Sequence, residues 1–319
     1  MRALVSFIVP VRNDAERLRR CLSSIVNNSY PRELIEMIVI DNHSTDGSGR
    51  VARDAGAVVL HVTAGSVAEL RNRGARAALG TILAFVDSDH EIDRRWIENA
   101  VDVLATPNVV ATGALCVAEP SANWVQQQYD GLRDRPPARQ DVPWLGSGNL
   151  AIKRAAFEMV GGFNADLTAC EDVDLCNRLI ANGHRIVADP ALRSIHFGDP
   201  RTLKALFFGE LWRGRDNLTV TFRGPKTIRN LRSALIPVLQ LIALITCAAA
   251  IVVQWWWIAA TALLLAFAPA VARATVMLQR KLRPGIAGAV QALAVAIVYD
   301  FARALAILTQ GSHRARRSA

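Results

Sequence analysis

Apolar and polar residues follow each other in the first part of the chain in a pattern that changes period several times. Short apolar runs, typical of buried strands, alternate with segments whose apolar residues recur every three or four positions, typical of helices. The expected strands cover residues 5–9, 35–40, 57–62, 82–86, 109–117 and 144–152. The expected helices cover residues 15–27, 48–55, 67–78, 91–103, 155–160 and 172–182. This alternation predicts an α/β fold with a mostly parallel sheet and right-handed crossovers.

The C-terminal part is dominated by Ala, Leu, Ile and Val. Its first uncharged run, 234–253, is long enough to cross a hydrocarbon core of about 30 Å as a helix. A second span is expected over 255–276, and it begins with three successive tryptophans, which favour the membrane interface. The third apolar stretch, 285–309, contains Asp300 and Arg303, which are expected to pair on one helix face. It fits a spanning helix, an interfacial helix or a helix packed on the other two.

Clusters of basic residues flank these apolar stretches. They are Lys226, Arg229 and Arg232, then Arg280, Lys281 and Arg283, and finally Arg314, Arg316 and Arg317. The positive-inside rule places the first two clusters in the cytoplasm, and a full third span would leave the last cluster outside, so we favour the interface for 285–309. We expect a catalytic domain over 1–225 and a membrane domain over 226–319.

The formal net charge of +9 raises the question of a nucleic-acid partner. Much of the excess lies beside apolar stretches, where basic residues attract anionic lipid headgroups, and no nucleic-acid motif is present. We therefore expect a membrane as partner and no nucleic acid. The apolar run at the N-terminus is too short for a signal peptide and reads as a buried strand, which predicts that the catalytic part stays in the cytoplasm. The five cysteines form no close metal-type pair.

Asp87-Ser88-Asp89 follows directly after the expected strand 82–86. Strands of a parallel sheet deliver such carboxylates to its carboxyl edge, where open α/β folds bind ligands, and carboxylate oxygens suit Mg²⁺ or Mn²⁺. The alternative is that Asp87 and Asp89 only cap the helix expected from Glu91. The sequence alone leaves both interpretations open.

The acidic pair belongs to a series of motifs in a fixed order. They are residues 8–14 (IVPVRND), 39–48 (VIDNHSTDGS), 71–74 (RNRG), 87–89 (DSD), 146–149 (GSGN), 161–163 (GGF) and 171–179 (EDVDLCNRL). The series resembles the family 2 glycosyltransferases of the GT-A fold, and the resemblance covers roughly residues 4–200. It implies an enzyme that uses a nucleotide-sugar donor.

The resemblance assigns six residues to the donor pocket: Pro10, Arg12, Asp14, Asp41, Arg71 and Asp87. Asp41 follows a strand, and its carboxylate can accept hydrogen bonds from base N–H or ribose hydroxyl groups, although a turn-forming role is the alternative. Arg71 is expected near the donor, or else paired with Glu69 on its own helix. The resemblance also places the metal ion, Mn²⁺ or Mg²⁺, on Asp89 and His196, and a purely structural role for His196 is equally compatible with the sequence.

Asp172 is the expected catalytic base, with Glu171 supporting it or contacting the acceptor. An inverting transfer needs one carboxylate to remove the proton of the acceptor hydroxyl, since the metal ion assists the leaving group. Both acids also suit capping of the helix that they begin. Asp174 is expected on the exposed face of that helix.

The Gln-x-x-Arg-Trp motif of processive relatives is absent, and the corresponding region, 209–215, reads GELWRGR. We therefore expect a membrane-anchored, metal-dependent, inverting glycosyltransferase of hexosyltransferase type that acts in polysaccharide biosynthesis at the cell inner membrane. It would move one sugar from a UDP-, GDP- or dTDP-sugar to a lipid-linked or cell-surface glycan acceptor. One alternative is transfer to polyprenyl phosphate, and another is a catalytically silent glycan-binding or membrane scaffold protein.

Overall fold

The computed structural model describes residues 2–225, 228–280 and 285–309, which form two compact units. The first unit contains the chain up to Glu119 together with Asp134–Gly198. The second contains Pro120–Arg133 and the chain from Asp199 onward. The contacts thus group an internal segment with the C-terminal helices, and the expected domain boundary at residue 225 stays a prediction.

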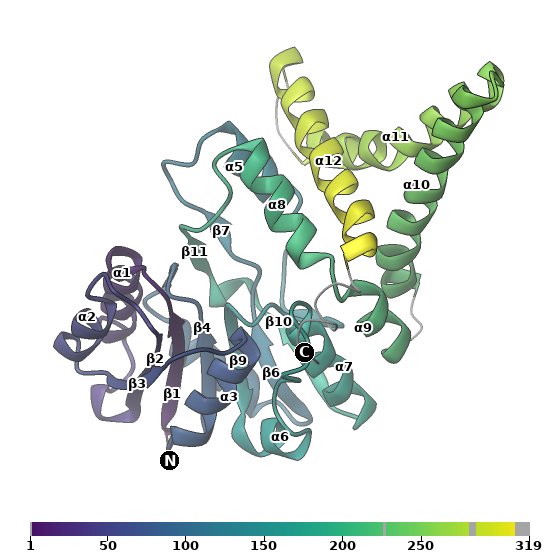
Figure 1. Cartoon of the computed structure of the whole chain (residues 1–319). Coiled ribbons are helices and arrows are strands. Elements are labelled where there is room, and N and C mark those ends of the chain that lie inside the picture. The colour runs from purple at the N-terminus through teal and green to yellow at the C-terminus, as the bar shows by residue number, and fades with distance from the viewer. Residues whose placement is uncertain (1, 226–227, 281–284, 310–319) are drawn as a thin grey trace. The chain divides into compact units, whose positions relative to one another are not determined.

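An eight-stranded sheet forms the centre of the first unit (Figure 1). Its strands, in spatial order, are β3 (Val58–Val62), β2 (Ile35–Asn42), β1 (Val5–Val11), β4 (Ile82–Val86), β9 (Asn149–Lys153), β6 (Val109–Gly113), β10 (Arg185–Ala188) and β8 (Gln140–Asp141). The strands β3, β2, β1 and β4 are parallel, whereas β9 is antiparallel to both of its neighbours and β8 is antiparallel to β10. The predicted mostly parallel sheet is confirmed.

Helices bury both faces of this sheet in two hydrophobic cores. The helices of the first unit are α1 (Ala15–Val26), α2 (Ser48–Asp54), α3 (Val67–Ala77), α4 (Trp96–Ala105), α6 (Arg154–Met159) and α7 (Glu171–Ala181). Apolar residues of α1, α2 and α4 pack on one face, and those of α3, α6 and α7 pack on the other. All seven residues of β1 are buried because both faces are covered, which explains its nearly continuous apolar sequence.

A second, three-stranded sheet was not expected from the sequence. It consists of β5 (His90–Ile92), β11 (Ser194–His196) and β7 (Val117–Ala118), in that order. The helix predicted over 91–103 is therefore wrong at its start, since Glu91 lies in β5 and α4 begins only at Trp96. The strand predicted over 109–117 is also divided, because β6 ends at Gly113.

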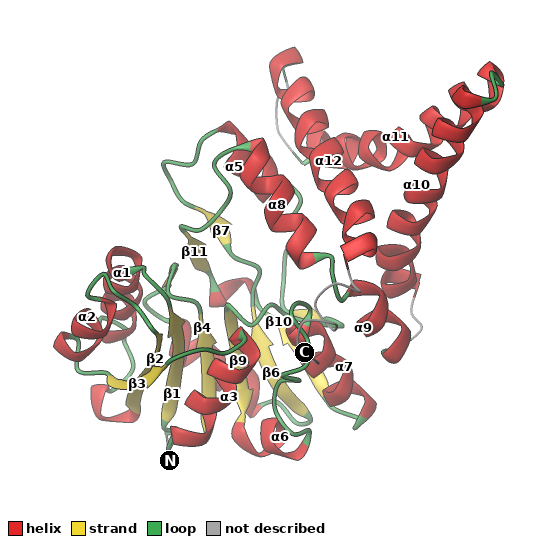
Figure 2. Cartoon of the chain, in the orientation of Figure 1, coloured by secondary structure: helices red, strands yellow, loops and turns green. Residues whose placement is uncertain are grey.

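The second unit is helical (Figure 2). Its helices are α5 (Trp124–Asp130), α8 (Leu203–Arg213), α9 (Asn217–Arg223), α10 (Ile228–Val252), α11 (Trp256–Gln279) and α12 (Ile286–Ala306). Three segments are long and apolar enough to cross a membrane: Leu231–Val252, Trp256–Gln279 and Ile286–Thr309. The third stretch therefore meets the same criterion of length and composition as the other two. Of the flanking basic residues, Lys226, Lys281, Arg283, Arg314, Arg316 and Arg317 lie outside the described residues.

Charged residues of the apolar helices pair between helices. Asp300 on α12 accepts from Arg273 on α11 at 2.8 Å, and Arg303 donates to Glu210 on α8 at 2.8 Å. Asp300 and Arg303 were expected to pair with each other on one helix face, but each pairs with a residue of another helix instead. Ionisable groups among apolar helices are favourable only when paired in this way.

Candidate active site

The acidic pair lies where β4 ends and β5 begins, so the capping interpretation of Asp87 and Asp89 is wrong. Asp87 is half-exposed, and its Oδ1 accepts a hydrogen bond from Arg71 Nη2 at 2.6 Å. Asp89 Oδ2 lies 3.3 Å from His196 Nε2 and 3.8 Å from Arg17 Nη1. Burial alone would raise the pKa of Asp89, but the hydrogen bond from His196 and the neighbouring cationic groups outweigh burial and hold this pKa below its ordinary range. Asp89 is therefore held in its anionic form.

The three-stranded sheet brings two histidines to this acidic pair. His90 on β5 lies directly opposite His196 on β11, and the centres of their rings are 4.7 Å apart. His90 Nε2 lies 4.0 Å from Asp89 Oδ1, while His90 Nδ1 shares a hydrogen bond of 3.1 Å with Ser194 Oγ. His196 is thus beside Asp89, as expected, and His90 is an additional imidazole that the sequence interpretation did not include.

Two glycines allow the carboxylates to lie against the backbone. A Cβ on Gly148 would lie 2.6 Å from Asp87 Oδ2, and a Cβ on Gly198 would lie 2.0 Å from Asp89 Oδ2. Ligand atoms of Asp87, Asp89 and His90 all lie within 4.8 Å of one another. Oxygen atoms from two carboxylates and one imidazole nitrogen form a donor set that suits Mn²⁺ or Mg²⁺, so these residues fit a divalent cation.

Arg71 links the acidic pair to the start of α7. It is almost fully buried, and besides Asp87 it donates from Nη1 to Glu171 Oε1 at 2.8 Å. The alternative pairing with Glu69 is wrong, because the Glu69 carboxylate belongs to the capping box of α3 with Ser66. The Nε atom of Arg71 is buried without a hydrogen-bond partner among the described residues. A buried guanidinium with two carboxylate partners holds both of them in fixed positions.

Glu171 and Asp172 begin α7 and differ in their surroundings. Glu171 is buried and also lies 3.4 Å from Ser147 Oγ, whereas Asp172 Oδ1 accepts from the backbone N–H of Val173 at 2.8 Å. Burial and then the charge of Glu171 raise the pKa of Asp172 to about 7. Asp172 can therefore gain and lose a proton near neutral pH, as a general base must.

Asp174, by contrast, does not lie on an exposed surface as expected. It is buried and pairs with Arg178 at 2.7 Å, one turn further along α7. This i, i+4 arrangement is common on helices.

The residues expected around the nucleotide lie at the ends of β1 and β2. Asp41 is opposite Val11 in the parallel register, and its buried carboxylate accepts from Ser44 N at 3.0 Å and lies 3.3 Å from His61 Nδ1. The turn-forming contact of Asp41 is therefore present, and it leaves the second carboxylate oxygen toward His61. Pro10 is buried in β1, Arg12 is exposed after it, and Asp14 binds Arg17 at 2.8 Å.

The structure adds His90, Arg17 and Ser147 to the residues predicted from sequence. His90 could have been found from its position next to Asp89, had the following segment been recognised as a strand. Arg17 and Ser147 reach their partners, Asp89 and Glu171, only through tertiary packing. Ser147 belongs to the GSGN motif that carries the family resemblance, whereas the amphipathic helix that contains Arg17 has no specific signal.

Comparison with known proteins places this arrangement among sugar transferases. A model of the family Glycosyl transferase family 2 matches residues 6–163. Glycosyltransferase AglE of Haloferax volcanii is 27% identical over 219 residues, which are 65% of this chain and 69% of that protein. The pre-mycofactocin glycosyltransferase of Mycobacterium tuberculosis is 29% identical over 211 residues, which are 62% of this chain and 43% of that protein.

Solved structures give the same fold. The mannosyltransferase PcManGT from Pyrobaculum calidifontis, in complex with GDP-Man and Mn²⁺, has a TM-score of 0.60 at 22% sequence identity, and the match covers 94% of this chain and 87% of that chain. The expected α/β fold of the GT-A class, followed by apolar C-terminal helices, is confirmed.

Proposed function

The chain belongs to glycosyl transferase family 2, and we propose that it transfers one sugar, with inversion, from a nucleotide-sugar donor to a lipid-linked or cell-surface glycan acceptor. The observation that carries this proposal is the double contact of Arg71 with Asp87 and Glu171. It joins the carboxylates that suit a cation to the acids at the start of α7. Stabilisation of a leaving group and acceptance of a proton, the two requirements of the transfer, then belong to one site.

The donor is proposed to bind along the ends of β1, β2 and β4. In this proposal Pro10, Arg12 and Asp14 line the nucleotide pocket with Asp41, whose carboxylate accepts hydrogen bonds from the base or the ribose. Arg71 and Asp87 lie toward the diphosphate. The GDP-Man complex of PcManGT supports a nucleotide-sugar donor, and we include UDP-, GDP- and dTDP-sugars as candidates.

Asp89 and His196 are proposed to hold Mn²⁺ or Mg²⁺, with Asp87 and His90 beside them. The close approach of the two carboxylates to Gly148 and Gly198 and the anionic state of Asp89 support this assignment. When bound, such a cation neutralises the charge that develops on the departing nucleoside diphosphate. The Mn²⁺ of the PcManGT complex supports the same choice of metal.

Asp172 is proposed as the catalytic base. Its carboxylate removes the proton of the acceptor hydroxyl while that oxygen forms a bond to the anomeric carbon and the bond from this carbon to the diphosphate breaks. A single displacement from the side opposite the leaving group inverts the anomeric configuration. Burial, together with the charge of Glu171, which Arg71 holds in place, raises the pKa of Asp172 to about 7 and so suits it to this role.

A membrane-bound acceptor agrees with the composition of the second unit. Three of its helices can span a bilayer, and the side chains of Phe208 and Trp212 on α8 are exposed. Exposed aromatic side chains of this kind favour the membrane interface. Arg232 lies near the start of α10, and Arg280 follows the end of α11. By the positive-inside rule, these basic residues favour a catalytic unit on the cytoplasmic side of the cell inner membrane.

The test is nucleotide release by the purified full-length protein in mild detergent. UDP-, GDP- and dTDP-sugars are supplied in turn with Mn²⁺ or Mg²⁺ and a lipid extract as the source of acceptor. We expect cation-dependent release by the wild type and by Asp54→Asn, which changes an exposed acid on α2, and loss of release in Asp89→Asn. If the protein shows no nucleotide release and no donor-dependent thermal stabilisation, the catalytically silent scaffold is supported instead. Release that requires polyprenyl phosphate would identify a phosphate acceptor.

A further inference from the structure

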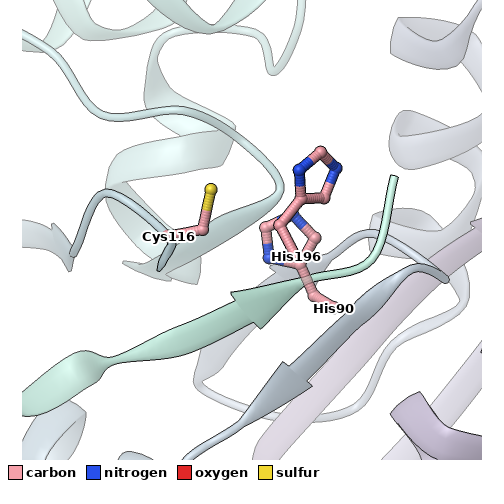
Figure 3. A group of neighbouring side chains, drawn as sticks. All are labelled: His90, Cys116 and His196. Atoms are coloured by element: carbon pink, nitrogen blue, oxygen red, sulfur yellow. The ribbon is translucent and has the colours of Figure 1, made fainter. Parts of the chain in front are cut away.

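A second group of side chains with the chemistry of metal ligands lies at the three-stranded sheet, and it combines the two histidines with a thiol in place of carboxylates. His90, Cys116 and His196 each offer one ligand atom, and these atoms all lie within 4.8 Å of one another (Figure 3). Figure 3 shows the two imidazole rings overlapping and the Cys116 side chain beside them. We propose that these three residues form a binding site for a thiophilic divalent cation, with Zn²⁺ as the representative ion.

The register of the small sheet builds this group. His90 and His196 are directly opposed in the antiparallel pair of β5 and β11, so their side chains leave the sheet on the same face. On the other side of β11, His196 is in register with Ala118 of β7. Cys116 lies directly before β7, two residues from Ala118, and its sulfur lies within 4.8 Å of the ligand nitrogens of both histidines. Three distant segments thus place their ligands together.

The donor chemistry separates this site from the proposed Mn²⁺ or Mg²⁺ site. A thiolate and two imidazoles are ligands that Zn²⁺ prefers, whereas carboxylate oxygens suit Mg²⁺ and Mn²⁺. Ligand atoms around tetrahedral Zn²⁺ lie roughly 3.5 Å apart, so binding requires the side chains to approach each other by about 1 Å. Three protein ligands leave the fourth position for water. The contact of His90 Nδ1 with Ser194 Oγ orients this ring, as outer contacts of metal-binding histidines commonly do.

The two sites share both histidines, since His196 also lies 3.3 Å from Asp89 in the proposed carboxylate site, and this has a functional consequence. His90 belongs both to the group with Cys116 and His196 and to the group with Asp87 and Asp89. Because one imidazole nitrogen binds one cation, occupancy of the thiophilic site competes with occupancy of the carboxylate site. A thiophilic cation therefore inhibits any activity that depends on the carboxylate site. Formation of the thiophilic site itself does not depend on the proposed transfer reaction.

Cobalt spectroscopy tests the site without any turnover. Co²⁺ added to the purified full-length protein is expected to give the near-ultraviolet absorption of a sulfur-to-cobalt charge transfer. Cys116→Ser should abolish this absorption, whereas Cys170→Ser, which changes another half-buried cysteine of the same unit, should retain it. Loss of the band in both variants, retention of it in Cys116→Ser, or no band in the wild type would overturn the proposal.

Alkylation of the wild-type protein gives an independent test that needs no variant. With Zn²⁺ at about ten times its Kd, roughly a tenth of the sites stay empty, so modification of Cys116 by iodoacetamide should slow about tenfold, as followed by mass spectrometry of its peptide. Mg²⁺ at the same concentration should not protect Cys116. Equal rates with Zn²⁺ and Mg²⁺ would contradict the site, even if the protein proved to transfer sugar.

Discussion

The two carboxylates that the proposed reaction depends on, Asp89 and Asp172, lie in regions of opposite charge. Asp89 is surrounded by His196, His90 and Arg17, and these groups keep its pKa low in spite of burial. A carboxylate in this state remains an anion over the whole physiological range. It is suited to bind a cation and cannot act as a proton acceptor near neutral pH.

Asp172 lies beside another acid. Arg71 donates to Asp87 and Glu171 and lowers the pKa of Asp172, but burial and then the charge of Glu171 outweigh it and raise this pKa to about 7. Two chemically identical carboxyl groups thus acquire different protonation behaviour from their different surroundings. Carboxylates whose pKa values are moved apart in this way mark separate catalytic roles.

Replacement of Arg71 should have the largest effect, because it removes the link between the two regions. Arg71→Met leaves Asp87 and Glu171 without their shared cation, which typically lowers the free energy of unfolding by about 3–5 kcal/mol for a broken buried ion pair. We expect nucleotide release to fall below detection and the thermal midpoint to drop. Arg73→Met, on the exposed face of the same helix, serves as the control and should resemble the wild type. An active and stable Arg71→Met would show that the bridge has no role.

A glycine-to-alanine substitution beside Asp89 should disturb cation binding, whereas the same substitution beside Asp172 should not. A Cβ on Gly198 would lie 2.0 Å from Asp89 Oδ2, whereas a Cβ on Gly146 would lie 3.7 Å from Asp172 Oδ2, an ordinary contact. Gly198→Ala should therefore weaken Mn²⁺ binding by about 10–100-fold, as displaced contacts near metal ligands do. Titration calorimetry should find unchanged Mn²⁺ affinity for Gly146→Ala. Equal affinities in the two variants would argue against cation binding beside Asp89.

The pH dependence of transfer should report the protonation of Asp172. Only the carboxylate form accepts a proton, and its pKa of about 7 means that this form is lost as the pH falls below 7. The rate under single-turnover conditions should therefore decrease about tenfold per pH unit below 7 and level off above it. A rate that stays constant from pH 7 down to pH 5 would show that no group with this raised pKa acts as the base.

The smallest expected effect is on stability. The folded pKa of Asp172 exceeds the unfolded value of about 3.9, so the native state binds its proton more tightly and the ionised acid destabilises the fold at high pH. Asp172→Asn removes this cost. A gain of ~1 kcal/mol in the free energy of unfolding raises the thermal midpoint by about 2–4 °C, so the variant should exceed the wild type by this amount at pH 8. The difference should shrink as the pH falls from 7 toward 4. A lower midpoint at pH 8 would mean that the carboxylate stabilises the fold.

A buried acid of the second unit shows why burial alone does not mark a base. Burial would raise the pKa of Glu210, but the charges of Arg303 and Arg213 and a hydrogen bond from Tyr129 lower it instead. Its carboxylate oxygens are engaged by these partners, so its role is structural. Asp172 differs because its neighbour carries the same charge.

Much of the fold follows from local sequence signals. The buried run of β1 and the capping box at Ser66 and Glu69 predict a strand and a helix start by themselves. The three-stranded sheet could not be predicted, because β5 and β7 are only two or three residues long and are stabilised by pairing with a strand about eighty to a hundred residues away. Strands of two or three residues are too short to show an alternation of apolar and polar residues in the sequence.

The sequence also placed the acids of the site but not the contacts between them. Asp87, Asp89, Glu171 and Asp172 follow strands or begin a helix, positions that local pattern reveals. Arg71 pairs with Glu171 and not with Glu69 because the tertiary structure brings α3 close to the start of α7. The raised pKa of Asp172 comes from burial and then from the charge of Glu171, and both depend on tertiary packing that the sequence does not reveal.

Donor binding and transfer, measured side by side in two variants, can separate the roles of Asp89 and Asp172. The full-length protein carries either Asp89→Asn or Asp172→Asn, and cation-dependent donor binding is followed by calorimetry while nucleotide release reports transfer. We predict that Asp89→Asn loses both, and that Asp172→Asn binds the donor like the wild type but transfers about 10²–10⁴-fold more slowly. Full transfer by Asp172→Asn, or equal loss of donor binding in both variants, would contradict the division of roles between the two carboxylates.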